Sequence, residues 1–226
     1  QIFITHDHID HCGMAGRIKE VSGAEIHMSK LSRPFTARSE REDFAARVQG
    51  FCLIHGLPRQ TIDSVISLFL KSGEDSSRFR IDQYFTPNQT LRIGNKRLQV
   101  IPTPGHTLDH VSFFFPEEKV LLSGDHVLPE ITPNLSPDLF SPDFFPLRSF
   151  LESLLRADHL PVTKVYPAHG RPFSSLSRRI EELKTHHEVR KALTLQSVQM
   201  GPKHTFQISQ DIFGSDLPEF DQYLAL

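Results

Sequence analysis

Residues 5–13 read Thr-His-Asp-His-Ile-Asp-His-Cys-Gly, and this stretch carries most of the information about the fold. Three histidines and a carboxylate fall within six positions: His6, His8, Asp10 and His11. Neutral imidazole is the commonest metal ligand in proteins, and four such groups this close can hold one or two cations. The pattern arises by chance in only roughly one such chain in a few hundred. The alternative, a solvated loop rich in histidine, leaves the ligand-type residues elsewhere in the chain unexplained.

Short apolar runs precede ligand-type residues at four places in the chain. Residues 1–5 combine apolar and β-branched side chains, which is typical of a strand, and residues 13–18 look like the opening of a helix. The other runs end at His106 in Pro-Gly-His-Thr, at Asp125 in Ser-Gly-Asp, and at His169 in Pro-Ala-His-Gly. Open α/β sheets usually place their sites where strands end. The pattern therefore predicts that strand ends bring these residues together.

The order of these motifs resembles that of the metallo-β-lactamase-fold hydrolases, and the arrangement is most similar to the glyoxalase II-like branch. The resemblance extends from residue 1 to about residue 190. It implies an α/β fold, a four-layer αβ/βα sandwich built around a metal centre. It is specific for the fold and the metal centre but not for the substrate, because this fold carries many hydrolytic chemistries and a few redox ones.

The resemblance also implies how the ligands are shared. His6, His8 and His106 would hold one metal, Asp10, His11 and His169 the second, and Asp125 would bridge the two. Asp10 would in addition orient the attacking hydroxide, which makes it the candidate catalytic residue. Two Zn²⁺ ions are expected, although the same ligand types also suit iron and manganese. A glutamate in place of His8 would favour the di-iron redox branch, so the histidine favours hydrolysis.

Three residues beside the ligands have roles that the sequence suggests. Thr5 and Asp7 flank His6, and either could hydrogen-bond a ligand imidazole. Cys12 could in principle be a ligand or a nucleophile. We expect it instead to pack as a small buried residue at the start of the helix, which is the usual role of a free cysteine.

Two further histidines lie close to the ligands in sequence. His110 follows His106 by four residues and either contacts the substrate, supports Asp125 or is a partly buried structural histidine. His126 directly follows Asp125. We do not expect His126 to be a ligand, because adjacent residues in a strand or turn usually point in different directions. We expect it, like His110, to support the ligands or to contact the substrate.

The ligand set predicts a metal-dependent hydrolase that uses a dinuclear-metal hydroxide to cleave an ester, thioester or lactone. The alternatives are a phosphodiesterase or nuclease of the same fold, a mononuclear-iron sulfur dioxygenase, and a disabled domain. A nuclease would need a basic groove, for which the candidate residues are Arg78, Arg80, Arg92, Lys96 and Arg97. We interpret these as a solvated hairpin face. Six phenylalanines line an acyl pocket or, for the larger part, belong to the core: Phe113, Phe114, Phe115, Phe140, Phe144 and Phe145.

The domain organisation follows from the same patterns. Residues 1–200 are expected to form the metal-hydrolase domain, with a helical insertion at about 35–80, and residues 201–226 to begin a small helical C-terminal domain. In the insertion, a capping box at 39–42 starts one helix, and a second begins near Pro58. The insertion is expected to form a lid over the site, and the alternative is a helix pair packed on the outer face of the fold.

Hairpins and helices account for much of the remaining chain. The expected hairpins turn at 94–95 and 116–118, and the expected helices cover 145–159 and 175–198.

Composition sets the outer bounds. A chain of 226 residues can bury one sizeable core. The formal net charge of −2 creates no field for polyanions, so we expect a small-molecule substrate and no nucleic acid. No apolar run approaches the ~20 residues of a spanning helix, so no membrane is expected. The two cysteines suggest a reducing compartment and a cytoplasmic location. Composition predicts no oligomeric state.

The chain opens directly on the strand that leads into the metal motif. Proteins with this resemblance carry further strands ahead of that motif, usually ending in an Asp-x-Gly turn, and no matching segment stands in this sequence. We therefore expect a fold without its N-terminal strands and one sheet with an unpaired edge. The absence of a signal peptide is uninformative for the same reason.

Overall fold

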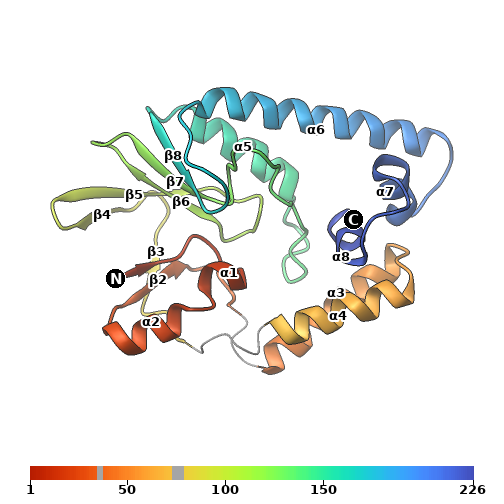
Figure 1. Ribbon diagram of the computed structural model, residues 1–226, viewed down its shortest axis with the longest axis horizontal. Helices are drawn as coiled ribbons and strands as arrows, with labels where there is room; N and C mark the ends of the chain where they lie inside the picture. Colours follow the sequence, from red (N-terminus) through yellow and green to blue (C-terminus); the bar gives the residue numbers. More distant parts are fainter. Residues whose placement is uncertain (35–37, 73–78) are drawn as a thin grey trace. The chain divides into compact units, whose positions relative to one another are not determined.

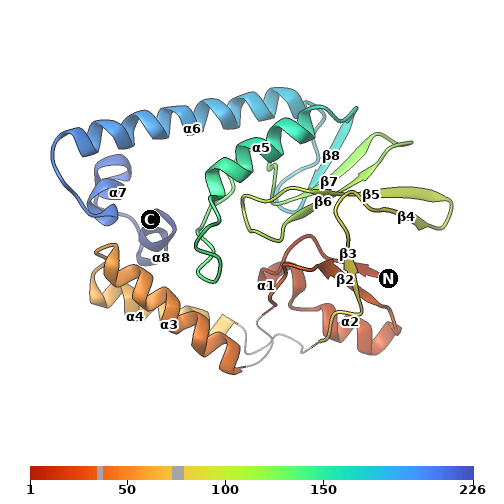
Figure 2. The same cartoon turned by 180° about the vertical axis from the view of Figure 1, so that it is seen from behind.

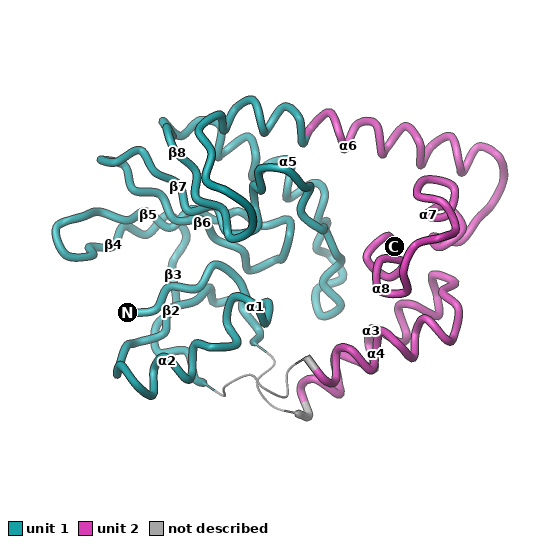
Figure 3. Tube along the Cα trace, in the orientation of Figure 1, with its two compact units in different colours: residues 1–34, 76–183 teal, residues 35–75, 184–226 magenta. Residues whose placement is uncertain are grey.

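The computed structural model describes residues 1–34, 38–72 and 79–226. The chain divides into two compact units, which Figure 3 distinguishes by colour. Unit 1 comprises Gln1–Pro34 and Ser76–Leu183, and unit 2 comprises Phe35–Asp75 and Lys184–Leu226. The region expected to be an insertion therefore forms one unit with the C-terminal segment. Each unit is described by itself.

The first sheet of unit 1 has three parallel strands in the order β1-β2-β3. They are β1 (Ile2–Phe3), β2 (Ile26–Ser29) and β3 (Gln83–Phe85). The sequence patterns did not indicate β2, a four-residue strand with a polar residue at its second position. Within the described residues β1 is an outer strand of the sheet.

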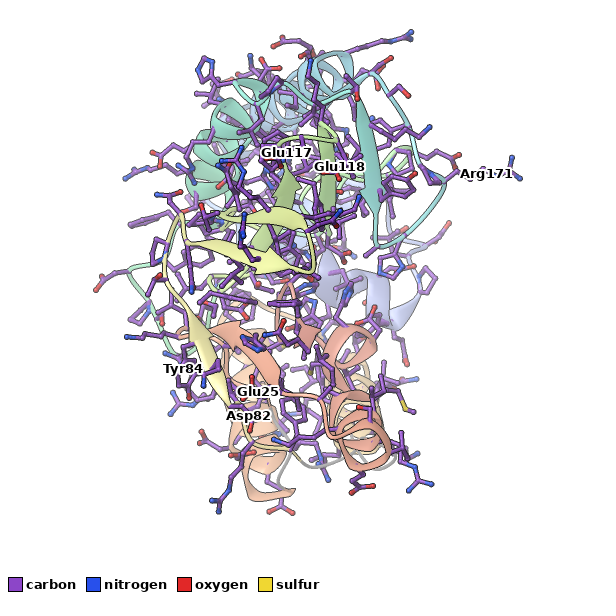
Figure 4. All side chains as sticks on the ribbon, turned by 90° about the vertical axis from the view of Figure 1, so that its left-hand side faces the viewer. Glu25, Asp82, Tyr84, Glu117, Glu118 and Arg171 are labelled. Carbon is purple, nitrogen blue, oxygen red and sulfur yellow. The ribbon has the colours of Figure 1, made fainter. Side chains whose placement is uncertain are left out.

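Asp82 joins β2 to the segment that enters β3. Its carboxylate accepts a hydrogen bond from the backbone N–H of Ile26 (2.8 Å) and forms an ion pair with Lys19 (2.5 Å). Figure 4 labels Asp82 beside Glu25 and Tyr84 on this sheet. Because strands this short form few ladder hydrogen bonds, the side-chain contacts of Asp82 help to set the register.

Two helices follow β1, namely α1 (Ile9–Cys12) and α2 (Ala15–Ser22). The second confirms the helix expected after the metal motif, whereas α1 lies within the motif and was not predicted. Gly23 ends α2 with φ 68°, a left-handed conformation that glycine adopts without strain.

The second sheet of unit 1 has five strands in the order β4-β5-β6-β7-β8. The strands are β4 (Thr90–Ile93), β5 (Lys96–Pro102), β6 (Val111–Phe115), β7 (Val120–Gly124) and β8 (Lys164–Pro167). The pairs β4–β5 and β6–β7 are the two expected hairpins, and β8 pairs parallel with β7.

Alternation along β6 shows how the sequence builds the layers. Phe113 packs between the two sheets, with Phe85 and Val100. Phe114 points to the other face, where it packs against α5 (Pro146–Asp158) and the start of α6 (Leu176–Gln199). Successive strand residues face opposite sides, so one apolar run serves two cores.

A third core lies between the first sheet and its helices, where Ile26 and Met28 pack against Cys12 and Ala15. The three cores separate four layers: α1 and α2, the three-stranded sheet, the five-stranded sheet, and α5 with the start of α6. Figures 1 and 2 show this order from opposite sides. Unit 1 is thus the α/β four-layer sandwich that the sequence predicts.

Unit 2 is helical. It contains α3 (Arg38–Ile54), α4 (Arg59–Ser72), the remainder of α6, α7 (Thr205–Phe213) and α8 (Glu219–Leu224). The backbone N–H of Phe206 donates to the carbonyl of His55 (3.0 Å), and the His55 ring contacts the Thr205 hydroxyl (2.7 Å). These bonds join the expected insertion to the C-terminal segment.

Three of our predictions about this region are not tested by the structure. The capping box involves Ser39, whose side chain lies outside the described residues, although α3 does begin at Arg38. The predicted lid and the predicted domain boundary at residue 200 stay predictions. None of the helices in the described ranges is long and apolar enough to cross a membrane.

Candidate metal centre

Strand ends in unit 1 bring the seven predicted ligands together. His6 follows β1, His106 follows β5, Asp125 follows β7 and His169 follows β8, while α1 carries the rest or begins beside them. Among the described residues, three groups have ligand atoms within 4.8 Å of one another: His6, His8 and His106; His6, His11 and Asp125; and Asp10, His11 and His169. The first and third groups are the two sets that the family resemblance implied.

The first group is held by its surroundings. The Nδ1 atom of His6 contacts the hydroxyl of Thr5 (3.0 Å), as the sequence suggested. The Nδ1 atom of His106 lies 2.7 Å from the carbonyl of Asn134 and must donate to it, because a carbonyl only accepts. The Nε2 atom of His106 is therefore unprotonated in the neutral ring, and it lies 3.0 Å from Nδ1 of His8.

Asp125 lies between the first and third groups. Its Oδ2 atom is 3.4 Å from Nε2 of His106, 3.5 Å from Nε2 of His11 and 3.6 Å from Nε2 of His169. Asp10 reaches the same place from α1, with its Oδ2 atom 3.3 Å from Nε2 of both His11 and His169. Asp125 therefore occupies the position expected of a bridging carboxylate.

Nε2 of His6 and Oδ1 of Asp125 are buried polar atoms without a hydrogen-bond partner within the described part of the chain. Nε2 of His11 faces carboxylate oxygens of Asp10 and Asp125 at 3.3 and 3.5 Å. Buried polar atoms are nearly always paired, so an unpaired set that converges on one place calls for an explanation. One divalent cation in the first group would satisfy His6, and Asp125 could bind that ion and a second one in the third group. Imidazole with carboxylate suits zinc, iron or manganese.

The electrostatics of the cluster keep His106 and Asp125 in the form that binds a metal. For His11, burial is outweighed by the hydrogen bond and charge of Asp125 and the charge of Asp10, and its pKa is raised. Burial, followed by the charge of His8, lowers the pKa of His106 to about 4, so the ring is neutral near pH 7. Burial by itself would raise the pKa of Asp125. The hydrogen-bonding influence of His11 and the positive charges of His106, His11 and His169 outweigh burial, and the pKa of Asp125 is lowered. Metal ligands must be deprotonated, and His106 and Asp125 meet this condition near pH 7.

Two glycines of the motifs have steric reasons to be glycine. Gly105, with φ 149°, precedes His106, and a Cβ there would lie 2.6 Å from Cα of Phe150. Gly124, with φ 53°, precedes Asp125, and a Cβ there would lie 2.7 Å from Nε2 of His110. Both values fall in the region that favours glycine.

The two further histidines that lie close to the ligands in sequence are buried. His110 and His126 belong to none of the three ligand groups among the residues described. The His126 ring lies 5.2 Å from the Phe150 ring, and burial lowers the pKa of His126 to about 3. His126 is therefore a neutral core residue, and the expectation that it is no ligand agrees with its position.

Cys12 and Asp7 also have clear places. Cys12 is buried, its thiol contacts the carbonyl of Asp7 (3.3 Å), and burial with the nearby carboxylates raises its pKa to about 12. The thiol is thus unsuited to act as nucleophile or ligand. The suggestion that Asp7 holds an imidazole does not match its observed contact, because its carboxylate accepts from the backbone N–H of Arg33 (2.6 Å).

Two supports of the site were not predicted from the sequence. One is the carbonyl of Asn134, which orients His106. The other is Asp109, whose carboxylate accepts from Ser32 (2.6 Å) and Thr107 (2.5 Å). Burial and the charge of Asp7 raise the pKa of Asp109 to about 7. Ser32 is 77 residues from Asp109 in the chain, and nothing in the sequence links them.

A cavity of about 200 Å³ lies in unit 1 beside Asp109 and His110, with mostly apolar walls. Of the six phenylalanines considered for an acyl pocket, Phe144 lines this cavity, whereas Phe113 and Phe114 belong to cores.

The candidate basic groove is partly neutralised. Lys96 pairs with Glu118 (2.5 Å) and Arg97 pairs with Glu117 (2.5 Å), and Figure 4 labels both glutamates on the five-stranded sheet. Arg171, close to His169 in sequence, extends away from the fold (Figure 4). Arg78 lies outside the described residues.

The family model described as "Metallo-beta-lactamase superfamily" matches residues 1–169. Among curated proteins, the chain is similar to Beta-lactamase-like protein 2 homolog of Caenorhabditis elegans, with 34% identity over 96 residues, which is 42% of this chain and 30% of the relative. It is also similar to Lactamase-like protein aptB of Emericella nidulans, with 30% identity over 102 residues, 45% of this chain and 30% of the relative. Each match thus spans under a third of the relative's length.

Two solved structures cover nearly the whole chain. The metallo-beta-lactamase family protein TTHA1429 from Thermus thermophilus has a TM-score of 0.80 and 31% identity, covering 99% of this chain and 71% of that one. A beta-lactamase domain protein from Burkholderia ambifaria has a TM-score of 0.80 and 27% identity, covering 99% of this chain and 65% of that one.

Proposed function

The chain belongs to the metallo-beta-lactamase superfamily, and from this premise we propose that it is a metal-dependent hydrolase that cleaves an ester, a thioester or a lactone. The observation that carries the proposal is the convergence of three groups of ligand-type side chains on one place in unit 1, where Nε2 of His6 and Oδ1 of Asp125 are buried and unpaired in the described chain. Members of this superfamily are typically hydrolytic enzymes.

The residues that would hold the metals divide as the family resemblance implies. His6, His8 and His106 would hold one ion, Asp10, His11 and His169 the other, and Asp125 both. Two Zn²⁺ ions fit these donors, as would iron or manganese. Bound divalent metal lowers the pKa of a water to about 7 and polarises a carbonyl oxygen.

Asp10 is the candidate catalytic residue of the chain itself. Its side chain is exposed, so it can meet both solvent and substrate. It would accept a hydrogen bond from the attacking water and so orient the lone pair of that water toward the carbonyl carbon of the substrate. His169, within 3.3 Å of the same carboxylate, would keep Asp10 in this orientation.

The alternatives have less support from the chain. A phosphodiesterase or nuclease would need the basic residues that Glu117 and Glu118 neutralise, so a small-molecule substrate is the better match. A mononuclear-iron dioxygenase would leave the second set of ligands without a purpose. Membership of the glyoxalase II-like branch, and a lid formed by α3 and α4, belong to the same proposal.

The test is metal analysis of the purified protein by plasma mass spectrometry, together with hydrolysis of a panel of acyl thioesters, esters and lactones. We expect two metal ions per chain and hydrolysis that a chelator abolishes and zinc restores. A single iron with no hydrolysis would favour the dioxygenase. Cleavage of a phosphodiester but of no acyl substrate would favour the nuclease.

A further inference from the structure

His110 is a fully buried residue that immediately precedes β6 and packs beside the candidate metal centre. Its ring centroid lies 5.0 Å from that of His6 and 6.2 Å from that of His106. It is only 1% exposed and belongs to none of the ligand groups in the described chain. It also lines the cavity of about 200 Å³ described above. The sequence left its role open between substrate contact, support and core packing, and its hydrogen bonds favour support.

The hydrogen bonds of His110 determine where its proton sits. The backbone N–H of Asp125 points at Nε2 of His110, at 3.1 Å. A backbone N–H only donates, so Nε2 must carry a lone pair. The neutral ring then carries its proton on Nδ1, which lies 2.8 Å from the hydroxyl of Thr103 and donates to it.

The bonds continue from Thr103 and return to the Asp125 turn. The Thr103 hydroxyl lies 2.9 Å from that of Ser112, which lies 3.3 Å from the carbonyl of Ser123. Because a carbonyl only accepts, Ser112 donates to Ser123 and Thr103 donates to Ser112. We call this chain of hydrogen bonds, from the N–H of Asp125 through His110, Thr103 and Ser112 to the carbonyl of Ser123, the relay. All of its donors point in the same direction along it, and Thr103, Ser112 and Ser123 are all buried.

The relay therefore hydrogen-bonds to the backbone on both sides of Gly124. One end receives the N–H of Asp125, and the other end donates to the carbonyl of Ser123. Gly124 leaves no room for a side chain, because a Cβ would come within 2.7 Å of Nε2 of His110. The next residue after His110 also binds the segment between β1 and α1, since the N–H of Val111 donates to the carbonyl of Thr5 (2.8 Å).

We propose that His110 is a positioning residue, which holds the carboxylate of Asp125 between the two ligand groups through this closed relay of hydrogen bonds. The inference rests on the proposed function, in that Asp125 is taken to be the bridging ligand. His110 acts through its fixed tautomer, with Nε2 as acceptor and Nδ1 as donor. An imidazole protonated on both nitrogens could not accept from Asp125, and the ring with its proton on Nε2 could not either.

Two variants distinguish the hydrogen bond that Nε2 of His110 accepts from the one that Nδ1 donates. In His110→Gln the side-chain carbonyl can take the place of Nε2 and accept from the Asp125 N–H. In His110→Asn the shorter amide can take the place of Nδ1 and donate to Thr103, but it leaves the Asp125 N–H without an acceptor. The same two substitutions at His159, an exposed residue at the end of α5, are the matched controls.

The readouts do not depend on catalysis. The first is hydrogen exchange of the Asp125 amide in the metal-free protein, and the second is the affinity for Zn²⁺. We expect His110→Asn to accelerate the exchange and to weaken Zn²⁺ binding by roughly 10- to 100-fold, the usual cost of removing a partner that orients a ligand. His110→Gln should lose markedly less in both readouts, and the His159 variants should match wild type.

Equal losses in His110→Gln and His110→Asn, or no loss in either, would overturn the proposal, because a packing role does not distinguish the two amides. If neither variant folds, ¹⁵N NMR of wild-type His110 decides: a proton on Nε2 overturns the inference, and a proton on Nδ1 supports it. If wild type binds no Zn²⁺, the proposed function fails, and the amide exchange and the tautomer still test the positioning role.

Discussion

The first ligand group (His6, His8 and His106) and the third (Asp10, His11 and His169) differ in how far their side chains are exposed to solvent. His6 and His106, in the first group, are 0% and 8% exposed. The side chains of Asp10 and His169, in the other group, are 55% and 49% exposed. His8 is the exposed member of the first group, so burial there is concentrated on two of three ligands.

This difference has a consequence for metal binding. His6 and His106 are oriented by Thr5 and by the carbonyl of Asn134 before any ion arrives, so binding costs little ordering of the side chains. Asp10 and His169 lie in solvent, and ordering them opposes binding. We infer that the first group holds its ion more tightly and releases it more slowly than the second.

The largest effect is expected from the residue that both groups share. Asp125→Asn keeps the shape of the side chain but removes its charge, and it should weaken binding of both ions and lower any hydrolysis by at least roughly a hundredfold. Metal content and hydrolysis rate are the measurements, with exposed Asp216→Asn as the control. Loss of only one ion would show that Asp125 does not bridge.

The next effect separates the two groups. His106→Ala should remove the tightly held ion, whereas His169→Ala should leave one ion that survives dialysis against a weak chelator. The physical reason is the prior orientation of His106 by Asn134. Metal content after dialysis in steps of increasing chelator strength is the measurement. If His169→Ala loses both ions while His106→Ala retains one, the inference that the first group binds its ion more tightly is wrong.

A smaller effect tests the backbone that carries the first group. Gly105→Ala places a Cβ 2.6 Å from the Phe150 backbone in a conformation that disfavours a side chain, so it should lower the free energy of unfolding by about 1–3 kcal/mol. Gly50→Ala, in α3, is the matched control. Its Cβ meets nothing within 4 Å in the described structure, and it should stabilise by about 0.5–1 kcal/mol. Urea unfolding measures both, and equal effects would contradict the prediction.

A further expected effect concerns pH. Burial and the charge of Asp7 raise the pKa of Asp109 to about 7, above its ordinary value near 4. Between these values the folded protein binds more protons than the unfolded chain, so stability falls as the pH rises through this window. In the metal-free protein, Asp109→Asn should flatten this decline. A slope that Asp109→Asn leaves unchanged between about pH 4 and about pH 7 in urea unfolding would show that Asp109 is ionised throughout.

Much of the site could be predicted because its ligands are encoded locally. His6, His8, Asp10 and His11 lie in one short stretch, and each of the other ligands directly follows an apolar run. Chain order and strand direction then require these residues to meet at one edge. Their role as ligands rests on the resemblance and on the unpaired atoms, and metal analysis will decide it.

The supports of the site could not be predicted in the same way. Asp109 meets Ser32 across 77 residues, and Asn134 orients His106 with its backbone carbonyl, which every residue type possesses. The grouping of α3 and α4 with α7 and α8 was likewise absent from the sequence patterns. Each depends on contacts between distant segments that have no shared motif.

The sequence by itself determined the alternation that builds the two faces of β6, the glycines before His106 and Asp125, and the identity of the ligand-type residues. These follow from local rules of side-chain direction and backbone strain. The tertiary structure alone decided which imidazole nitrogens are free, which carboxylate lies between the groups, and that the proton of His110 sits on Nδ1. A proton's position depends on the partner opposite it, and partners from distant segments exist only once the chain has folded.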